Sequence, residues 1–140
     1  MFLIDTNVVS EIRKGRRANI GVQKFFDEAE RNDALCFLSV VTIGELRRGV
    51  ELVKHRGDIQ QTIVLESWLE SVREEYADRI LDFTEEIAMT WGKLMVPHPE
   101  NAIDKQIAAT AFHRGLTVIT RNIDDFASSG IPVINPFLHN

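Results

Sequence analysis

Short apolar runs alternate along the chain with stretches of helical periodicity. The runs comprise residues 2–4, 35–38, 80–81, 116–120 and 132–134. They are too short for helices and almost wholly apolar, which predicts strands buried on both faces, as in a parallel sheet. Three segments between them repeat apolar residues at i, i+3, i+4 and i+7, which predicts amphipathic helices: 22–29, 65–72 and 87–94. This alternation predicts an α/β fold with a mostly parallel sheet.

Residues that commonly begin and end helices agree with this pattern. Thr84 precedes Glu85 and Glu86, which predicts an N-cap with acidic side chains in the first turn, where they offset the helix dipole. Asn101 is predicted to cap a further helix, which ends at Gly115.

Length and composition narrow the class of protein. The 140 residues are 44% hydrophobic, which predicts a single domain spanning 1–140. Cys36 is the single cysteine and lies in an apolar run, so disulfide frameworks and cysteine zinc sites are excluded. No membrane span or signal peptide is evident, and we expect a cytoplasmic protein with no membrane partner. The net charge of -5 by itself argues against a polyanionic partner.

Two acidic residues stand where a parallel sheet presents the carboxyl ends of its strands. Asp5 directly follows the first predicted strand, and open α/β sheets bind ligands in the crevice at that edge. Capping of the next helix is an equally good explanation of Asp5. Glu45 lies about one turn after the second predicted strand, beside Ile43 and Leu46, where compensation of the helix dipole also accounts for it.

Two further polar sites follow in the second half of the chain. Asp104 stands three residues after Asn101, as a capping-box acid would, but the small residues at 107–111 favour a close approach to the sheet. The segment 120–126 follows the fourth predicted strand and contains Asn122, Asp124 and Asp125, which are also common turn residues.

Together these side chains indicate a site for a divalent cation. Three or more carboxylates in one crevice repel one another, and their pKa values rise unless a cation neutralises them. Ligand sets of oxygen alone suit Mg²⁺, with Mn²⁺ as an alternative. Such an ion supports the attack of water on a phosphodiester. The residues therefore predict metal-dependent phosphodiester hydrolysis.

Four segments in order resemble the PIN-domain ribonucleases, and among them the VapC and FitB type of toxin from bacterial toxin–antitoxin pairs. The segments are Leu3–Glu11, Ser39–Val50, Asp104–Ala111 and Leu116–Phe126, and Asn135–Phe137 resembles the family's usual ending. The resemblance covers nearly the whole chain, and four motifs at compatible spacing make it specific.

The resemblance implies a single PIN-like domain with a central parallel five-stranded sheet, in the order 3-2-1-4-5, and helices on both faces. It also implies Mg²⁺-dependent endonucleolytic cleavage of RNA. Asp5, Glu45 and Asp104 fall on the family's acidic positions, and Asp5 and Asp104 are expected to hold the metal. Thr6 and Asn7 are expected to hydrogen-bond around Asp5.

The fourth position of the site departs from many relatives, which carry Asp where this chain has Asn122. An amide can orient a water molecule but cannot take a proton. Asp125, in preference to Asp124, is expected to compensate. One bound metal is favoured over two.

The resemblance further implies a homodimer and a cognate antitoxin whose C-terminal segment occupies the active-site groove, where an Arg pairs with the carboxylates. The distribution of charge weakens the objection to an RNA substrate. Residues 1–56 carry 10 basic and 8 acidic side chains, and residues 57–140 carry 6 and 13. The basic segment 13–17 is the better candidate for phosphate contacts, and Arg47 and Arg48 share a predicted helix with Glu45.

Two other functions are alternatives to an endoribonuclease. A non-catalytic binding module, with a catalytically weak or inactive PIN-like site, is the alternative that Asn122 keeps open. A phosphohydrolase with Asp5 as covalent nucleophile is disfavoured, because such sites carry a second Asp where this chain has Asn7.

Overall fold

The computed structural model describes residues 1–138 and contains a five-stranded parallel sheet in the order β3-β2-β1-β4-β5. The strands are β1 (Phe2–Ile4), β2 (Cys36–Ser39), β3 (Ile80–Leu81), β4 (Thr117–Ile119) and β5 (Val133–Ile134). Each lies within one residue of the predicted apolar run. The predicted α/β class and the strand order are confirmed.

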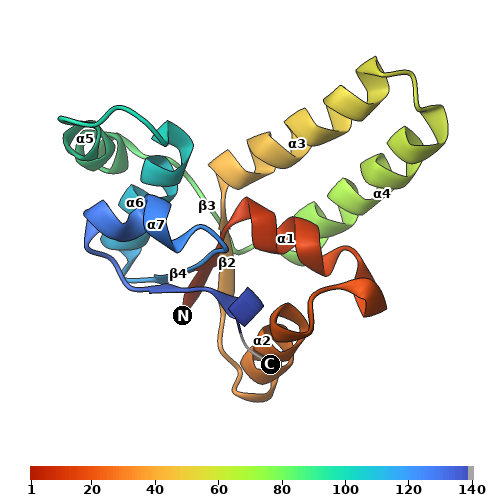
Figure 1. Ribbon diagram of the computed structural model, residues 1–140, viewed down its shortest axis with the longest axis horizontal. Coiled ribbons are helices and arrows are strands. Elements are labelled where there is room, and N and C mark those ends of the chain that lie inside the picture. The colour runs from red at the N-terminus through yellow and green to blue at the C-terminus, as the bar shows by residue number, and fades with distance from the viewer. Residues whose placement is uncertain (139–140) are drawn as a thin grey trace.

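Helices cover both faces of this sheet (Figure 1). One face carries α1 (Thr6–Ile12), α2 (Ile20–Arg31), α3 (Val40–His55) and α4 (Ile59–Glu75). The other carries α5 (Glu85–Leu94), α6 (Ala102–Arg114) and α7 (Ile123–Phe126). Three short 3-10 helices complete the described elements: η1 (Gly15–Arg17), η2 (Ala127–Ser129) and η3 (Pro136–Leu138).

Alternating strand residues divide the core into two layers. Ile4 and Ile119 belong to the cluster beneath α1 to α4, whereas Leu3 and Val118 belong to the cluster beneath α5 to α7. All four are fully buried, because a parallel strand between two helical layers leaves neither face to water. Cys36 is buried in the first cluster, as its apolar neighbours predicted.

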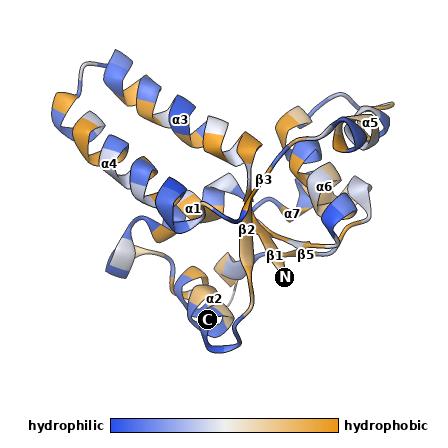
Figure 2. Cartoon of the chain, turned by 180° about the vertical axis from the view of Figure 1, so that it is seen from behind, coloured by the Kyte–Doolittle hydropathy of each residue, from blue (hydrophilic) through white to orange (hydrophobic). Residues whose placement is uncertain are grey.

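The helices α3 and α4 lie side by side and extend beyond the sheet (Figures 1 and 2). Apolar positions occur along both helices, and some of them face solvent: Leu52, Ile59, Ile63 and Val64. Within residues 1–138, no helix combines the length and apolar character that crossing a membrane requires.

The structure confirms three predicted helix ends, one of them without the expected side-chain bond. Thr84 Oγ1 accepts a hydrogen bond from Ile87 N at 3.2 Å, and Gly115 ends α6 with a left-handed φ of 64°. Asn101 is the N-cap residue of α6, as predicted, but its side chain makes no capping hydrogen bond. Its backbone is itself left-handed, with φ 58°, and its Nδ2 donates instead to Asp125 Oδ1 at 3.3 Å.

Candidate active site

The carboxylate of Asp5 lies at the carboxyl edge of the sheet and is 2% exposed. It is the N-cap of α1, and its Oδ1 accepts a hydrogen bond from Thr6 N at 2.8 Å. Its Oδ2 accepts from Thr120 Oγ1 at 2.7 Å and from Asn7 Nδ2 at 3.2 Å. Asp5 therefore caps a helix and also stands at the centre of a polar network, so the two sequence interpretations are compatible.

Burial raises the pKa of the Asp5 carboxyl above its usual range, and the charge of Glu45 adds to the rise. The hydrogen bonds from Thr120, Thr6 and Asn7 act in the opposite direction but do not cancel it. Asp5 is thus held in one orientation by three donors while its negative charge remains costly. A nearby cation would relieve that cost.

Thr120 directly follows β4 and links this strand to β1, its neighbour in the sheet. It is fully buried, and its Oγ1 accepts from Asn122 N at 3.0 Å as well as donating to Asp5. Asn7 Nδ2 lies 3.3 Å from the same oxygen, and Asn7 Oδ1 accepts from Arg121 N at 3.1 Å. The sequence indicated the segment 120–126 but assigned no role to Thr120. The available signal was a polar residue directly after a strand that neighbours β1.

Glu45 lies in the second turn of α3 and is half-buried. Its Oε1 accepts a hydrogen bond from Thr6 Oγ1 at 2.6 Å, and the Oγ1 atoms of Thr6 and Thr42 lie 3.3 Å apart. Thr6 therefore links Asp5, through its backbone N–H, to Glu45, through its hydroxyl. Thr6 and Asn7 both hydrogen-bond around Asp5, as expected from the sequence.

Asp104, in the first turn of α6, has the most strongly perturbed carboxyl of the site. Burial raises its pKa to about 7, and the charges of Asp5, Asp125 and Glu45 contribute to the rise. The small residues at 107–111 are buried against the sheet, and this close approach brings Asp104 toward the strand ends. We call Asp5, Glu45, Asp104 and Asp125 the acidic group.

The fourth predicted position lies on the exposed start of α7. Asn122 is exposed, and its backbone N–H and C=O bond to Thr120 Oγ1 and Asp125 N. Asp125 contacts Asn101 and acts on Asp104, whereas Asp124 is exposed in the groove beside it. The structure therefore brings Asp125 into the acidic group and leaves Asp124 at its margin.

The acidic group differs from the expected cluster of three or more carboxylates around one cation. Within residues 1–138, no three His, Cys, Asp or Glu side chains are close enough to hold one metal ion. The correction concerns distance, because Asp104 still lies within the electrostatic influence of Asp5, Asp125 and Glu45. Mg²⁺ commonly takes one or two carboxylates and fills its other positions with water. Raised pKa values and an oxygen-only donor set fit such an ion.

Several of the predicted phosphate contacts are engaged within the protein. Arg47 pairs with Glu66 at 2.8 Å and with Glu51 at 3.5 Å. Lys14 pairs with Glu11 at 2.9 Å. Arg13 lies over the Trp68 ring, 5.7 Å from its centroid, and lines a groove of 190 Å³ that also contains Glu45. Of these basic residues, Arg13 is therefore the one that shares a groove with the acidic group.

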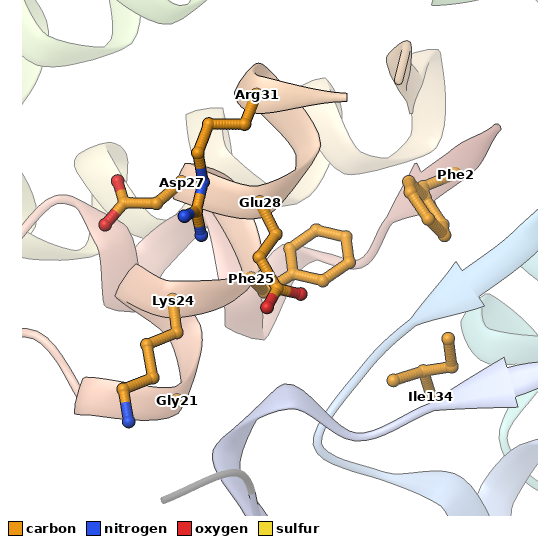
Figure 3. A pocket seen from close by; sticks show the side chains of 8 residues that line it. All are labelled: Phe2, Gly21, Lys24, Phe25, Asp27, Glu28, Arg31 and Ile134. Atoms are coloured by element: carbon orange, nitrogen blue, oxygen red, sulfur yellow. The ribbon is translucent and has the colours of Figure 1, made fainter. Parts of the chain in front are cut away.

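A cavity of 530 Å³ lies away from the acidic group, beside α2 (Figure 3). Its charged side chains come from α2, and Phe2 and Ile134 line it from the sheet (Figure 3). It contains none of the sequence-predicted site residues. Its size alone does not make it the active site, because the perturbed carboxyls lie elsewhere.

The sequence of this chain is similar to those of known proteins. The PIN domain family model matches residues 2–129. Toxin FitB of Neisseria gonorrhoeae is 33% identical over 142 residues, covering 98% of this chain and 99% of that protein. VapC ribonuclease Y4jK of Sinorhizobium fredii is 30% identical, covering 98% of each.

Solved structures show the same similarity in three dimensions. The crystal structure of FitAcB from Neisseria gonorrhoeae superposes with a TM-score of 0.84 at 34% identity, covering 99% of this chain and all of that one. A toxin–antitoxin complex from Klebsiella pneumoniae gives a TM-score of 0.63 at 26% identity, covering 97% of this chain and 98% of that one.

Proposed function

The chain belongs to the PIN domain family, and from this premise we propose that it is a metal-dependent endoribonuclease that acts as the toxin of a toxin–antitoxin pair. One observation carries the proposal. Asp104 has a pKa raised to about 7 beside Asp5, Asp125 and Glu45, at the carboxyl edge of the sheet. Carboxyls perturbed by burial and by one another are typical of functional sites. The ribonuclease Y4jK and the toxin FitB support the activity and the biological role.

Asp5 and Asp104 would hold the ion, which we propose is Mg²⁺, with Mn²⁺ as the alternative. When bound, a divalent ion there offsets the carboxylate charge, attracts a phosphodiester and makes water more acidic. Asn7 and Thr120 keep Asp5 Oδ2 in place, and Thr6 N keeps Oδ1 in place. The chain thus supplies a rigid carboxylate at the point where charge must be balanced.

The reaction adds one water molecule across a phosphodiester bond. The water oxygen bonds to phosphorus, the bond to the leaving ribose oxygen breaks, and that oxygen takes up a proton. Glu45 is fixed through Oε1 by Thr6, while Oε2 has no hydrogen-bond partner within residues 1–138. We assign Oε2 the role of accepting the water proton, and the exposed Asn122 amide the role of orienting the water.

Removal of divalent ions tests the proposal directly. Purified protein with a panel of single-stranded RNAs and Mg²⁺ is expected to produce discrete fragments. EDTA is expected to abolish cleavage, and added Mg²⁺ or Mn²⁺ to restore it. Gel electrophoresis of end-labelled RNA provides the measurement. Undiminished cleavage in EDTA would contradict the metal mechanism.

A non-catalytic binding module remains the second candidate function, because Asn122 replaces a carboxylate and no three acids converge on one ion within the described residues. That candidate predicts intact RNA under every metal condition. The panel described above separates the two functions, since only an endoribonuclease produces fragments.

The substitution Asn122→Ala tests the fourth position of the site, where many relatives carry Asp. We expect cleavage to fall by about 3- to 10-fold, because a neutral hydrogen bond contributes about 1 kcal/mol. Asp125→Asn is expected to lower it by more than 10-fold, since a charged partner contributes about 1.5–3 kcal/mol. The ratio kcat/KM on one oligoribonucleotide measures both. If Asn122→Ala had the larger effect, Asn122 and not Asp125 would be the more important residue at the fourth position of the site.

The toxin role also requires an inhibitor and a place of action. We propose a cognate antitoxin as partner, which the toxin–antitoxin complex of the Klebsiella relative supports. We also propose that an Arg of this antitoxin pairs with the acidic group. We further propose that the toxin is a homodimer and acts on RNA in the cytoplasm.

A further inference from the structure

Arg121 follows directly after Thr120, the residue that donates to Asp5 Oδ2. Its backbone is held on both sides: its N–H donates to Asn7 Oδ1 at 3.1 Å, and its C=O accepts from Asn135 Nδ2 at 3.3 Å. Arg121 therefore starts from a fixed backbone position at the edge of the acidic group. Its side chain has no part in the proposed cleavage mechanism.

The Arg121 guanidinium lies over the Phe137 ring, 4.5 Å from the ring centroid. Asn135 organises this contact, because its Oδ1 accepts from Phe137 N at 3.0 Å while its Nδ2 donates to the Arg121 carbonyl. The Asn135–Phe137 segment thus restricts both the backbone and the side chain of Arg121. Stacking on an aromatic ring restricts the guanidinium without using its in-plane donors.

Those donors are available to a ligand. Within residues 1–138, the Arg121 guanidinium forms no ion pair and donates no hydrogen bond to the protein. Arg121 is exposed and lines a groove of 410 Å³ together with Asn122, Asp125 and Asn135. A guanidinium with an unused planar set of N–H groups matches two phosphate oxygens.

The charges around Arg121 are of both signs. Asp124 and Asp125 share its groove. Glu11 lies near enough for Arg121 to contribute to the lowering of its pKa, which is caused first by hydrogen bonds from Lys14 and Asn19 N. Lys14 belongs to the basic segment 13–17, so Arg121 lies near this segment, with Glu11 between them.

We propose that Arg121, stacked on Phe137, binds a phosphate of the RNA strand next to the phosphodiester at the acidic group. The proposal rests on the proposed function, because it names a contact to the RNA of that same site. It assigns the Asn135–Phe137 segment a purpose, namely to present the guanidinium in one orientation. If the contact of Arg121 with Phe137 served only to join β4 to η3, it would not need guanidinium N–H groups that have no partner within residues 1–138.

Binding of a fluorescein-labelled single-stranded oligoribonucleotide tests the contact. Fluorescence anisotropy measures this binding in EDTA at salt concentrations between about 20 and 150 mM, over which the screening of charge increases. Arg121→Gln is expected to weaken binding by about 10-fold, the loss of one charged hydrogen-bonding contact. The slope of log K against log salt should fall by about 0.7, the value for one phosphate contact on a single strand. Gel analysis verifies that the RNA stays intact.

Two variants separate charge from geometry, and a third is the matched control. Arg121→Lys should retain the slope but bind several-fold more weakly, because Lys lacks the planar fork. Phe137→Leu should do the same by loosening the guanidinium. Arg114→Gln changes the net charge identically at the end of α6, beside the start of β4 and therefore at the opposite edge of the sheet. It should leave affinity and slope unchanged.

An unchanged slope in Arg121→Gln, an equal change in Arg114→Gln, or no measurable RNA binding by the wild-type protein would overturn the proposal. A lower melting temperature without a change in slope would show a structural role and overturn it as well. If the slope changes as expected but Mg²⁺ produces no cleavage, the phosphate contact stands and the proposed catalysis fails. If Mg²⁺ produces cleavage but the slope is unchanged in Arg121→Gln, the proposed catalysis stands and the phosphate contact fails.

Discussion

Replacing Asp5 by Asn is expected to abolish RNA cleavage, with a loss of at least about 10³-fold in kcat/KM. The change removes one negative charge from the residue that Thr6, Asn7 and Thr120 hold in place. It therefore removes both a metal ligand and the charge that the metal balances. An amide also turns an NH₂ group toward at least one of these donors, so part of the network is lost.

The effect of Asp5→Asn on folding is expected to be small, because two contributions oppose each other. Loss of a hydrogen bond destabilises the protein, while loss of a buried charge with a raised pKa stabilises it. Circular dichroism should show a native spectrum and a melting temperature close to that of wild type. Asp27→Asn, an exposed change of the same kind on α2, should cleave normally. Cleavage within about threefold of wild type would remove Asp5 from the mechanism, a threshold well below the effect of a catalytic group.

Asp104→Asn is expected to have opposite effects on activity and on stability. Activity should fall by about 10²-fold or more, because a proposed metal ligand is lost. The metal-free protein should become more stable at pH 8, by about 1–2 kcal/mol. This gain is smaller than the pKa shift alone implies, because solvent screens a half-buried carboxyl.

The sign of the pH dependence follows from the direction of the shift. The pKa of Asp104 is about 7 in the folded protein and 3.8 when unperturbed, so folding favours its protonated form. The stability that protonated Asp104 contributes is fully present below about pH 4 and is lost as the pH rises toward 7. The advantage of Asp104→Asn should therefore be absent at pH 4, grow through pH 6, and be complete at pH 8.

Urea unfolding in EDTA at these three pH values measures the free energy of unfolding. Asp124→Asn, an exposed change in the groove that also contains Asp125, is the control and should show no such trend. Mg²⁺ should raise the melting temperature of the wild type and have less effect on Asp104→Asn, because only a bound ion stabilises the folded state. Equal stability of variant and wild type at pH 4 and pH 8 would contradict the interpretation of the raised pKa.

Local sequence signals were sufficient where a single element determines the outcome. The strands were predicted because residues buried on both faces must be apolar, as Leu3 and Ile4 are. Thr84 was identified as a cap because its bond to Ile87 N lies within one turn. Asn101 occupies the predicted N-cap position but makes no side-chain cap, since its backbone is left-handed and its Nδ2 donates to the distant Asp125.

By itself, the sequence determined the α/β class, the strand boundaries and the placement of Asp5 at a strand end, since burial and helix periodicity are encoded residue by residue. With the resemblance of its motifs, it also indicated the strand order. Only the tertiary structure decided which side chains meet. Thr120 reaches Asp5 across 115 positions, Asp125 rather than Asp124 joins Asp104, and Phe137 lies beneath Arg121. The first contact depends on the pairing of β1 with β4, the second on the packing of α6 against α7, and the third on the pairing of β4 with β5. No local pattern specifies distances of an ångström between elements so far apart in the sequence.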